Sequence, residues 1–206
     1  MVLNDHDSTA KAARRSSRQP GYEKTKLKMQ REHAKYYCEK GYDQSGLEER
    51  FVNFDVGRGV FATQMFKKGD FLLQYVGKNI TVREGKELEK AYFKERRMVY
   101  LYIFKHDSRM YCIDATEETK RLGRLVNDGD GVHEPVNCAM KVLPRESRNQ
   151  SPVICLFATR DIFPDEELRY DYGNPLLPWR KAVATRKEGP YAPIRLLYVN
   201  PVVCNL

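Results

Sequence analysis

Cysteine, tryptophan and long apolar stretches are scarce in this sequence, and each scarcity excludes a class of protein. The 206 residues include five cysteines and one tryptophan. The cysteines are odd in number, widely scattered and never spaced as Cys-x-x-Cys, which argues against a disulfide framework and a structural zinc site. No apolar run approaches membrane-spanning length, and the polar N-terminus lacks the apolar core of a signal peptide. We therefore expect a soluble intracellular protein with no bound metal.

The composition bounds the size of the fold and the charge of its partners. With 41% hydrophobic residues, a chain of this length can bury one core, so we expect one domain with tails. The net charge of +8 and the pI near 9.2 favour an anionic partner such as nucleic acid or a membrane surface. A solvated cationic surface would give the same composition, so charge alone leaves the partner open.

The N-terminal part of the chain divides into an arm and a helical flank. The arm covers residues 1–21, of which residues 10–20 are small, polar and basic and cannot bury enough apolar surface to fold alone. Residues 22–50 form the predicted flank, because residues 23–40 contain no proline or glycine and are rich in helix-forming side chains. Gly41 stands where such a helix would end. We predict a flexible basic arm followed by a charged surface helix.

The middle of the chain, residues 51–174, is predicted to be a mainly β domain. Short apolar runs rich in β-branched or aromatic residues alternate with turn-forming residues, and one stretch rich in Glu, Lys, Leu and Ala has helical spacing. The predicted strands cover residues 59–63, 71–76, 99–104, 110–113, 139–143 and 153–158, the helix covers 83–95, a short helical turn covers 117–122 and a polar hairpin loop covers 144–152. The C-terminal flank, residues 175–206, contains several prolines and predicts no single regular element.

Two short motifs are candidates for binding and chemistry. In Val-Gly-Arg-Gly at residues 56–59, glycines on both sides of an arginine would let the backbone approach a ligand closely. An isolated Gly-x-Gly is more often an ordinary turn that enters a strand. Tyr170 and Tyr172 would face the same side of an extended strand and could flank one slot. Paired tyrosines are also common on half-buried strands, so each motif alone is weak.

Three segments in strict order resemble the SET-domain protein lysine methyltransferases. They are residues 56–63 (VGRGVFAT), 121–127 (RLGRLVN) and 166–173 (EELRYDYG). Residues 111–119 and 158–162 are similar to the branch of the family that monomethylates a lysine in the histone H4 tail. The resemblance covers most of the chain. It implies a mainly β SET-domain fold of small curved sheets, with a pseudoknot-like C-terminal threading and an N-terminal flanking helix.

The resemblance also implies S-adenosylmethionine as methyl donor and assigns the site residues by position. The cofactor-binding residues would be Val56, Gly57, Arg58, Gly59, Tyr100, Asn127 and Asp128. The catalytic residues would be Tyr172, which orients the amine and the methyl group, Tyr75, which lines the lysine channel, and Tyr170, which limits how many methyl groups fit. Without the resemblance, Tyr100 would be interpreted as a core side chain.

The implied reaction is a direct displacement on a sulfonium by the neutral amine of lysine. A free lysine has a pKa of about 10.4, so little of it is reactive at neutral pH. A phenol-lined channel would desolvate the ammonium, and a nearby sulfonium would repel it, so both would favour loss of its proton. Alignment of donor and amine would lower the barrier by roughly 7 to 11 kcal/mol, and no acid or base triad is needed.

The sequence departs from the family pattern at the cofactor segment. Asp128 stands where family members usually have the histidine of an Asn-His-Ser stretch. A carboxylate changes the charge and hydrogen bonding there, and its negative charge would favour a cationic donor. The long loop of residues 129–136, with Asp130, His133 and Glu134, is either an acidic lip for a basic tail or a solvated insertion. The lone Trp179 would cover the substrate groove or anchor the chain end.

Taken with the resemblance, these residues predict a nuclear, chromatin-associated enzyme that monomethylates a lysine of the histone H4 tail on nucleosomes. The basic arm and helix over residues 11–31 would contact nucleosomal DNA or the acidic nucleosome face, and no membrane partner is expected. Three alternatives stay open: a silent SET module that binds histone tails or scaffolds chromatin, a methyltransferase with a non-histone substrate, and a nucleic-acid binder. The sequence leaves the oligomeric state open.

Overall fold

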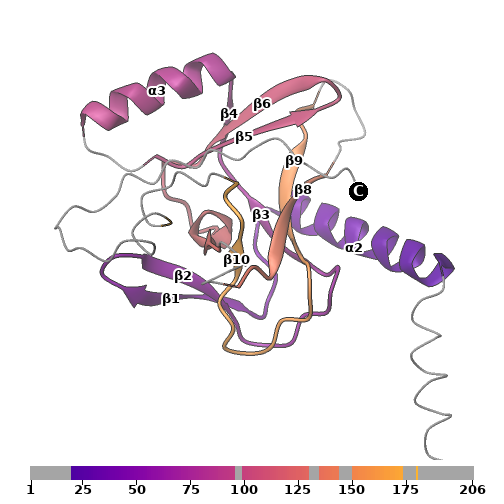
Figure 1. Ribbon diagram of the computed structural model, residues 1–206. Helices are drawn as coiled ribbons and strands as arrows, with labels where there is room; N and C mark the ends of the chain where they lie inside the picture. Colours follow the sequence, from indigo (N-terminus) through magenta and orange to yellow (C-terminus); the bar gives the residue numbers. More distant parts are fainter. Residues whose placement is uncertain (1–19, 96–98, 130–134, 144–149, 174–179, 181–206) are drawn as a thin grey trace, which may run out of the picture.

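The computed structural model of the protein describes residues 20–95, 99–129, 135–143, 150–173 and 180. In chain order the elements of these ranges are α2 (Pro20–Lys40), β1 (Leu47–Asn53), β2 (Gly57–Ala62), β3 (Phe71–Tyr75), β4 (Lys78–Ile80), α3 (Val82–Lys94), β5 (Leu101–His106), β6 (Arg109–Asp114), the 3-10 helix η1 (Leu122–Leu125), β7 (Asn127–Asp128), β8 (Cys138–Leu143), β9 (Val153–Ala158) and β10 (Arg169–Tyr170). Figure 1 shows their arrangement, with α2 and α3 on opposite sides of the strands.

Four small sheets make up the β part of the described fold. β1 pairs with β2, β9 lies between β3 and β8, and β6 lies between β4 and β5. These three sheets are antiparallel. β7 and β10 form a short parallel pair although they are far apart in the sequence. The predicted mainly β class of small sheets with an N-terminal helix is confirmed.

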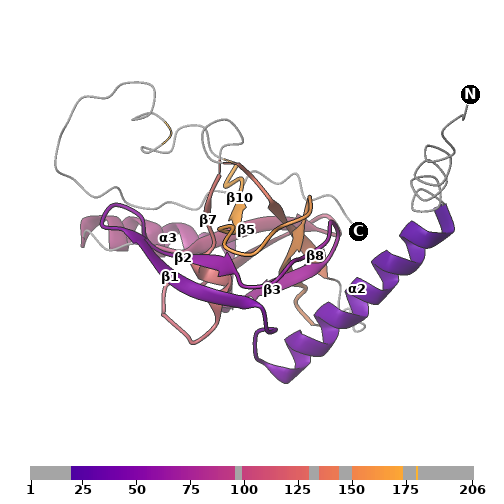
Figure 2. The ribbon, with the colours of Figure 1, turned by 90° about the horizontal axis from the view of Figure 1, so that it is seen from below.

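The segment that precedes β10 lies between the first hairpin and β7. Leu168 N donates a hydrogen bond to Val60 O at 2.7 Å, and Ala62 N donates one to Glu166 O at 2.9 Å. The next residues form β10, which pairs with β7. A segment from near the end of the SET region thus lies between β2 and β7, which come much earlier in the sequence. This arrangement accords with the predicted C-terminal threading (Figure 2).

The core is organised around β9. All of its residues, Val153–Ala158, are buried. On one face Phe157 packs in a cluster with Phe71 of β3 and Ala34 of α2. On the other face Ile154 and Leu156 join the main core. An uninterrupted apolar strand is stable here because both faces are covered, which explains why its sequence does not alternate.

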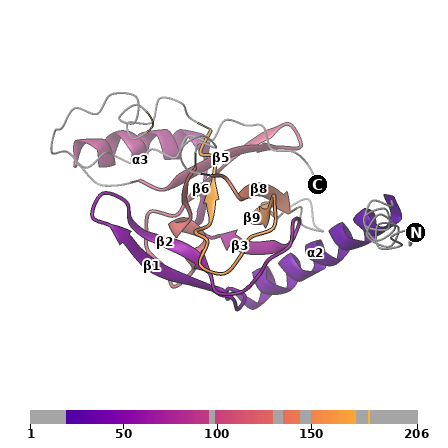
Figure 3. The ribbon, with the colours of Figure 1, turned by 60° about the horizontal axis from the view of Figure 1, so that its bottom comes forward.

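Helix α2 is longer and more buried than the sequence predicted. The helix begins at Pro20 rather than residue 23 and ends where Gly41 adopts a φ of 74°. Gly41 N donates a hydrogen bond to Tyr37 O at 3.0 Å, which closes the last turn. One face holds the fully buried Ala34, and Gln30 Oε1 accepts a hydrogen bond from Phe71 N at 2.8 Å. The helix is therefore docked on β3, as Figure 3 shows, and is not only a charged surface element.

Helix α3 confirms the predicted inserted helix and begins at a capping box. Glu84 N donates to Thr81 Oγ1 at 3.2 Å, and Glu84 Oε2 accepts from Thr81 N at 2.7 Å. Thr81 N and Thr81 Oγ1 both donate to the Glu84 carboxylate, and these two hydrogen bonds lower the pKa of that carboxyl. The apolar face packs on the β4–β6–β5 sheet through Val82 and Tyr92. The helix therefore covers one sheet and stays away from β9 (Figure 1).

Two features of the fold differ from the sequence predictions. Strand β1 begins inside the segment assigned as a helical flank, residues 22–50, and continues to Asn53. Its mostly exposed, charged sequence LEERFVN offers little strand signal. It forms a strand because its backbone pairs with β2 from Leu47 to Asn53. The helical turn predicted over residues 117–122 is found at Leu122–Leu125. The charged residues at the start of the predicted turn are exposed, whereas Leu125 and Gly123 are buried against β3.

Candidate active site

The structure brings the three predicted catalytic tyrosines together. Tyr75 ends β3, Tyr170 lies in β10 and Tyr172 follows two residues later, and each side chain is at most 2% exposed. The rings of Tyr170 and Tyr172 have centroids 4.7 Å apart and an interplanar angle of 46°. The rings of Tyr75 and Tyr102 lie 5.5 Å apart. A buried cluster of phenols therefore forms where β3 meets the inserted C-terminal segment.

The hydroxyl groups of this cluster have different surroundings. Tyr172 Oη donates a buried hydrogen bond to Val126 O at 2.8 Å, and Tyr75 Oη donates to Tyr100 O at 3.3 Å. Tyr170 Oη is buried and has no hydrogen-bond partner among the described residues. A buried hydroxyl without a partner costs about 1 to 3 kcal/mol, so this one is suited to a ligand or a water molecule.

Burial keeps the phenols neutral. It raises the pKa of Tyr75 and Tyr170 well above the ordinary value, and for both the neighbouring Tyr172 adds to the effect. Burial alone also raises the pKa of Tyr102. Neutral phenols surround a bound amine with dipoles and apolar ring atoms and no negative charge, so the cluster would favour an uncharged amine.

Asn127 and Gly59, both predicted to bind the cofactor, lie next to each other. Asn127 Nδ2 donates to Arg58 O at 3.1 Å and to Glu167 Oε1 at 2.6 Å. A Cβ at Gly59 would lie 2.4 Å from that same Glu167 oxygen and 2.9 Å from Asn127 Nδ2. The glycine is thus required for the close approach of three segments. Asn127 Oδ1 is buried and has no partner in the described chain.

Two supporting residues were missed by the sequence analysis. Glu167 Oε1 accepts the hydrogen bond from Asn127 Nδ2, and Glu167 Oε2 forms an ion pair with Arg169 Nη2 at 2.5 Å. Asn137 is 1% exposed; it donates to Glu167 O at 2.7 Å and accepts from Arg169 N at 2.9 Å. They set the position of β10 relative to β7. No local motif marks Asn137, because its partners lie far away in the sequence.

Arg58 and Tyr100 are joined by an electrostatic network that was also missed. Arg58 pairs with Glu118 and, at 3.1 Å, with Glu49, and these contacts raise its pKa. Glu118 also faces Arg124 at 3.5 Å, and the Arg124 guanidinium lies 4.0 Å from the centroid of the Tyr100 ring. The signal available was Arg124 within RLGRLVN, to which the sequence analysis assigned no role of its own.

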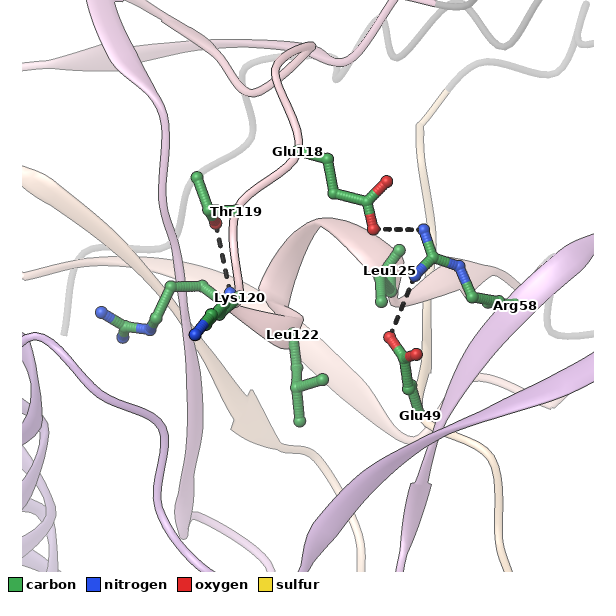
Figure 4. Close-up of a pocket in the computed structure, with 8 residues that line it drawn as sticks. Glu49, Arg58, Glu118, Thr119, Lys120, Leu122 and Leu125 are labelled. Atoms are coloured by element: carbon green, nitrogen blue, oxygen red, sulfur yellow. Dashed lines mark hydrogen bonds and ion pairs between the residues drawn. The ribbon is translucent and has the colours of Figure 1, made fainter.

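A pocket of about 430 Å³ opens beside this network. Its lining residues are Glu49, Arg58, Glu118, Thr119, Lys120, Arg121, Leu122 and Leu125. Figure 4 shows Arg58 held between Glu118 and Glu49 on one side of the pocket. Of the predicted cofactor residues, Arg58 alone lines it. The pocket therefore combines charged side chains of both signs with an apolar wall from η1.

Val56 ends the turn between β1 and β2, and Gly57 is the first residue of β2. Val56 N donates to Asn53 Oδ1 at 2.8 Å. Gly57 has a φ of 79°, a conformation that favours glycine. The turn and the start of β2 directly precede Arg58 and Gly59.

Comparison with known proteins connects this geometry to a family. Residues 57–173, more than half of the chain, match the SET domain family. The chain belongs to the SET-domain family. It is 42% identical over 142 residues to the histone-lysine N-methyltransferase Set8 of Drosophila melanogaster, and 37% identical over 163 residues to the N-lysine methyltransferase KMT5A-A of Danio rerio.

These matches cover most of the SET domain but only part of each relative. They span 66% and 78% of this chain, and 20% and 44% of the Drosophila and Danio proteins. The crystal structure of CpSET8 from Cryptosporidium superposes with a TM-score of 0.60 at 31% identity, covering 84% of this chain and 69% of that one. In both fold and sequence, this SET domain is therefore similar to the Set8 proteins.

The structure shows where the unusual Asp128 of this SET domain lies. Its Oδ1 accepts a hydrogen bond from Tyr172 N at 3.0 Å, and both of its carboxylate oxygens bond to the Arg180 guanidinium. The negative charge that was expected to favour a cationic donor is paired with the positive charge of Arg180. Hydrogen bonds to the carboxylates of Asp128 and Asp171 raise the pKa of the Arg180 guanidinium.

Several sequence predictions fall outside the described residues of the SET domain and its flanks. They concern the arm, the loop residues Asp130, His133 and Glu134, and Trp179. Within the residues that are described, no three His, Cys, Asp or Glu side chains gather in a way that could hold a metal ion. Neither helix of that part is long and apolar enough to span a membrane.

Proposed function

We propose that this SET domain transfers one methyl group from S-adenosylmethionine to the side-chain amine of a lysine in the histone H4 tail. The observation that carries the proposal is the junction of two features. The buried cluster of Tyr75, Tyr170 and Tyr172 is joined to the Gly59 and Asn127 contact through the β7–β10 pair. The Set8 and KMT5A relatives named as lysine methyltransferases support the same reaction.

The chain's residues fit the methyl donor. When bound, S-adenosylmethionine would supply an electrophilic methyl group on a sulfonium. Asn127 Oδ1 is a buried acceptor without a partner in the described residues, so it can receive an ammonium. Gly59 keeps the neighbouring backbone open, and Tyr100 with Arg58 would complete the cofactor side.

The tyrosines would prepare the lysine. The cluster removes water from the amine, which lowers its pKa and favours the neutral nucleophile. Tyr172 is held by its hydrogen bond to Val126 O, so its ring is a fixed wall beside Asn127. Fixed alignment of amine and methyl group supplies the largest part of the rate enhancement, roughly 7 to 11 kcal/mol.

Tyr170→Phe is expected to increase the dimethyllysine product. The Tyr170 hydroxyl is buried without a partner, so it can hold a water or the substrate amine and crowd the space for a second methyl group. Removing it opens that space at little structural cost, because no protein hydrogen bond is lost among the described residues. Mass spectra of a methylated H4 peptide measure the product ratio. An unchanged ratio would show that Tyr170 does not limit methylation.

Gly59→Ala is expected to weaken donor binding at least about 10-fold. The added Cβ would lie 2.4 Å from Glu167 Oε1 and 2.9 Å from Asn127 Nδ2, so the contact that orients Asn127 must break. Losing a hydrogen bond to a charged group in such a site corresponds to about 1.5 to 3 kcal/mol. Calorimetry with S-adenosylmethionine measures the change. Gly21→Ala is the control, since a Cβ there meets nothing within 4 Å.

The substrate, partners and compartment follow from the same proposal. We infer that the protein acts in the nucleus on nucleosomes, with its basic N-terminal region on nucleosomal DNA. The net charge of +8 supports this, and binding should weaken as salt rises because lysine and arginine release counterions from DNA. The test is incubation with labelled donor, nucleosomes and H4 peptide. Label on a lysine of H4 is the expected result, and no label on either substrate rejects the histone proposal.

The second candidate is a SET module without transferase activity that binds histone tails, and Asp128 favours it. A third is a methyltransferase with a non-histone substrate. Donor binding by calorimetry combined with the transfer assay separates them. Binding without any transfer supports a silent module, and transfer to other proteins but not to histones supports the non-histone enzyme.

A further inference from the structure

The carboxylate of Asp128 and the guanidinium of Arg180 meet at two points. Arg180 Nε donates to Asp128 Oδ2 at 2.8 Å, and Arg180 Nη2 donates to Asp128 Oδ1 at 2.5 Å. Arg180 Nη2 also donates to Gly129 O at 3.3 Å. Two parallel hydrogen bonds between a planar guanidinium and a carboxylate define an orientation as well as a distance.

This ion pair is shielded from solvent. The side chain of Asp128 is 7% exposed and that of Arg180 is 14% exposed. Ion pairs at such burial are weakly screened by salt, and removal of one partner leaves the other charge buried and uncompensated. The exposed pair of Arg83 and Glu87 on α3, with side chains 89% and 62% exposed, is the opposite case in the same chain.

The pair lies between the cofactor segment and the proposed catalytic tyrosine. Asp128 follows Asn127 in β7 and is paired with Tyr170 of β10. The same Oδ1 that bonds Arg180 accepts the Tyr172 backbone N–H at 3.0 Å. Arg180 Nη2 additionally donates at 2.6 Å to Asp171, the residue before Tyr172. The backbone at Tyr172 is thus held on one side by Asp128 and on the other through Arg180.

A histidine at position 128, the usual family residue, could not make this arrangement. A neutral imidazole has one acceptor nitrogen and could not receive both Arg180 and the Tyr172 N–H, and a charged one would repel Arg180. Asp128 and Arg180 are therefore complementary. Arg180 supplies the charge that Asp128 needs, and Asp128 supplies both acceptor oxygens.

We propose that Asp128 and Arg180 act as a positioning pair, which orients Tyr172 relative to the cofactor segment and joins the chain after the tyrosine motif to that segment. The role rests on the proposed methyl transfer. The pair would act through Tyr172 and Asn127 rather than on the substrate, so it should influence turnover and donor binding more than the affinity for peptide.

A double-mutant cycle tests the pair. Asp128→Asn and Arg180→Gln are compared singly and together, with Arg83→Gln as the control that breaks an exposed pair by the same substitution. Each single variant is expected to lower kcat about 10-fold or more, with peptide KM nearly unchanged, because small misplacement of reacting groups is costly. The double variant should be no worse than the poorer single variant, since the two residues act as one unit. Independent, additive losses would overturn the proposal, as would wild-type kcat in both single variants.

The family residue provides a second test in the same cycle. Asp128→His is expected to be less active than Asp128→Asn, because it places an imidazole against Arg180. Adding Arg180→Gln should restore part of the lost kcat by removing the facing cation. Failure of the second substitution to restore activity would contradict the pairing.

A measurement without turnover separates this proposal from the proposed function. Hydrogen exchange of the Tyr172 amide should be faster in Arg180→Gln than in the wild type and unchanged in Arg83→Gln. If the wild type transfers no methyl group but this difference is seen, the positioning pair stands and the enzymatic role fails. If the wild type is active and the Tyr172 amide exchanges equally in all three proteins, the positioning pair is rejected.

Discussion

Replacing Tyr172 by phenylalanine is expected to lower the rate of methyl transfer about 100-fold while the protein remains folded. Misplacing a reacting group by about 1 Å can reduce a rate by this factor. The Tyr172 hydroxyl donates to Val126 O at 2.8 Å, directly before Asn127 in the chain. The substitution keeps the aromatic ring but removes its hydroxyl group. It therefore also removes the hydrogen bond that holds the ring against the segment containing Asn127.

The Tyr172 variant is measured by single-turnover transfer to an H4 peptide. Its free energy of unfolding should fall by about 1 to 3 kcal/mol, because the Val126 carbonyl loses a buried partner. Tyr111→Phe is the matched control, since Tyr111 stacks on Phe104 at 5.3 Å outside the tyrosine cluster. Transfer at the wild-type rate by Tyr172→Phe would refute the assigned role. An equal loss in both variants would point to a general effect on the fold.

Gly123→Ala is expected to produce the largest loss of stability, about 3 kcal/mol. A Cβ at Gly123 would lie 2.1 Å from Gln74 O and 3.2 Å from Tyr75 Cα. Both are backbone atoms of β3, so neither can rotate away. Either η1 or the end of β3 must move, and that movement would displace the Tyr75 ring from the cluster. The expected result is a less stable protein whose residual activity is reduced as well.

Chemical denaturation measures the effect of Gly123→Ala on the free energy of unfolding. Gly21→Ala provides the comparison, because that glycine lies in α2 with nothing within 4 Å of a new Cβ. Alanine is the better helix former, so the control should be neutral or slightly stabilising. If Gly123→Ala unfolds at the wild-type midpoint, the packing of η1 against β3 is looser than the structure shows.

The regular elements with clear local signals could be predicted from the residues. The apolar run at β9 predicted a strand, and the structure adds that α2 and the main core cover its two faces. Gly41 predicted the end of α2, because the chain there needs a positive φ. Strand β1 was missed because its stability comes from pairing with β2, which its own charged sequence does not reveal.

The site residues also divide into those that the sequence marked and those that only the folded structure revealed. The resemblance assigned Gly59, Asn127 and the tyrosines to the proposed site, and folding brings Gly59 next to Asn127 and gathers the tyrosines in one buried cluster. Glu167 and Asn137, which connect these residues, carry no local pattern. Their roles depend on hydrogen bonds between segments that are distant in the chain, and many side chains could make such bonds equally well before folding selects the partners.

The residues along the chain predicted a mainly β domain with an N-terminal helix, because strand and helix propensity and glycine positions are properties of short segments. The resemblance of three ordered motifs supplied the SET family. Folding settled what surrounds the tyrosines and how Asp128 is compensated. That compensation depends on Arg180, fifty-two positions away, whose guanidinium meets the carboxylate in the folded structure, where β7 pairs with β10. Contacts of this kind depend on three-dimensional proximity, which spacing in the sequence does not specify.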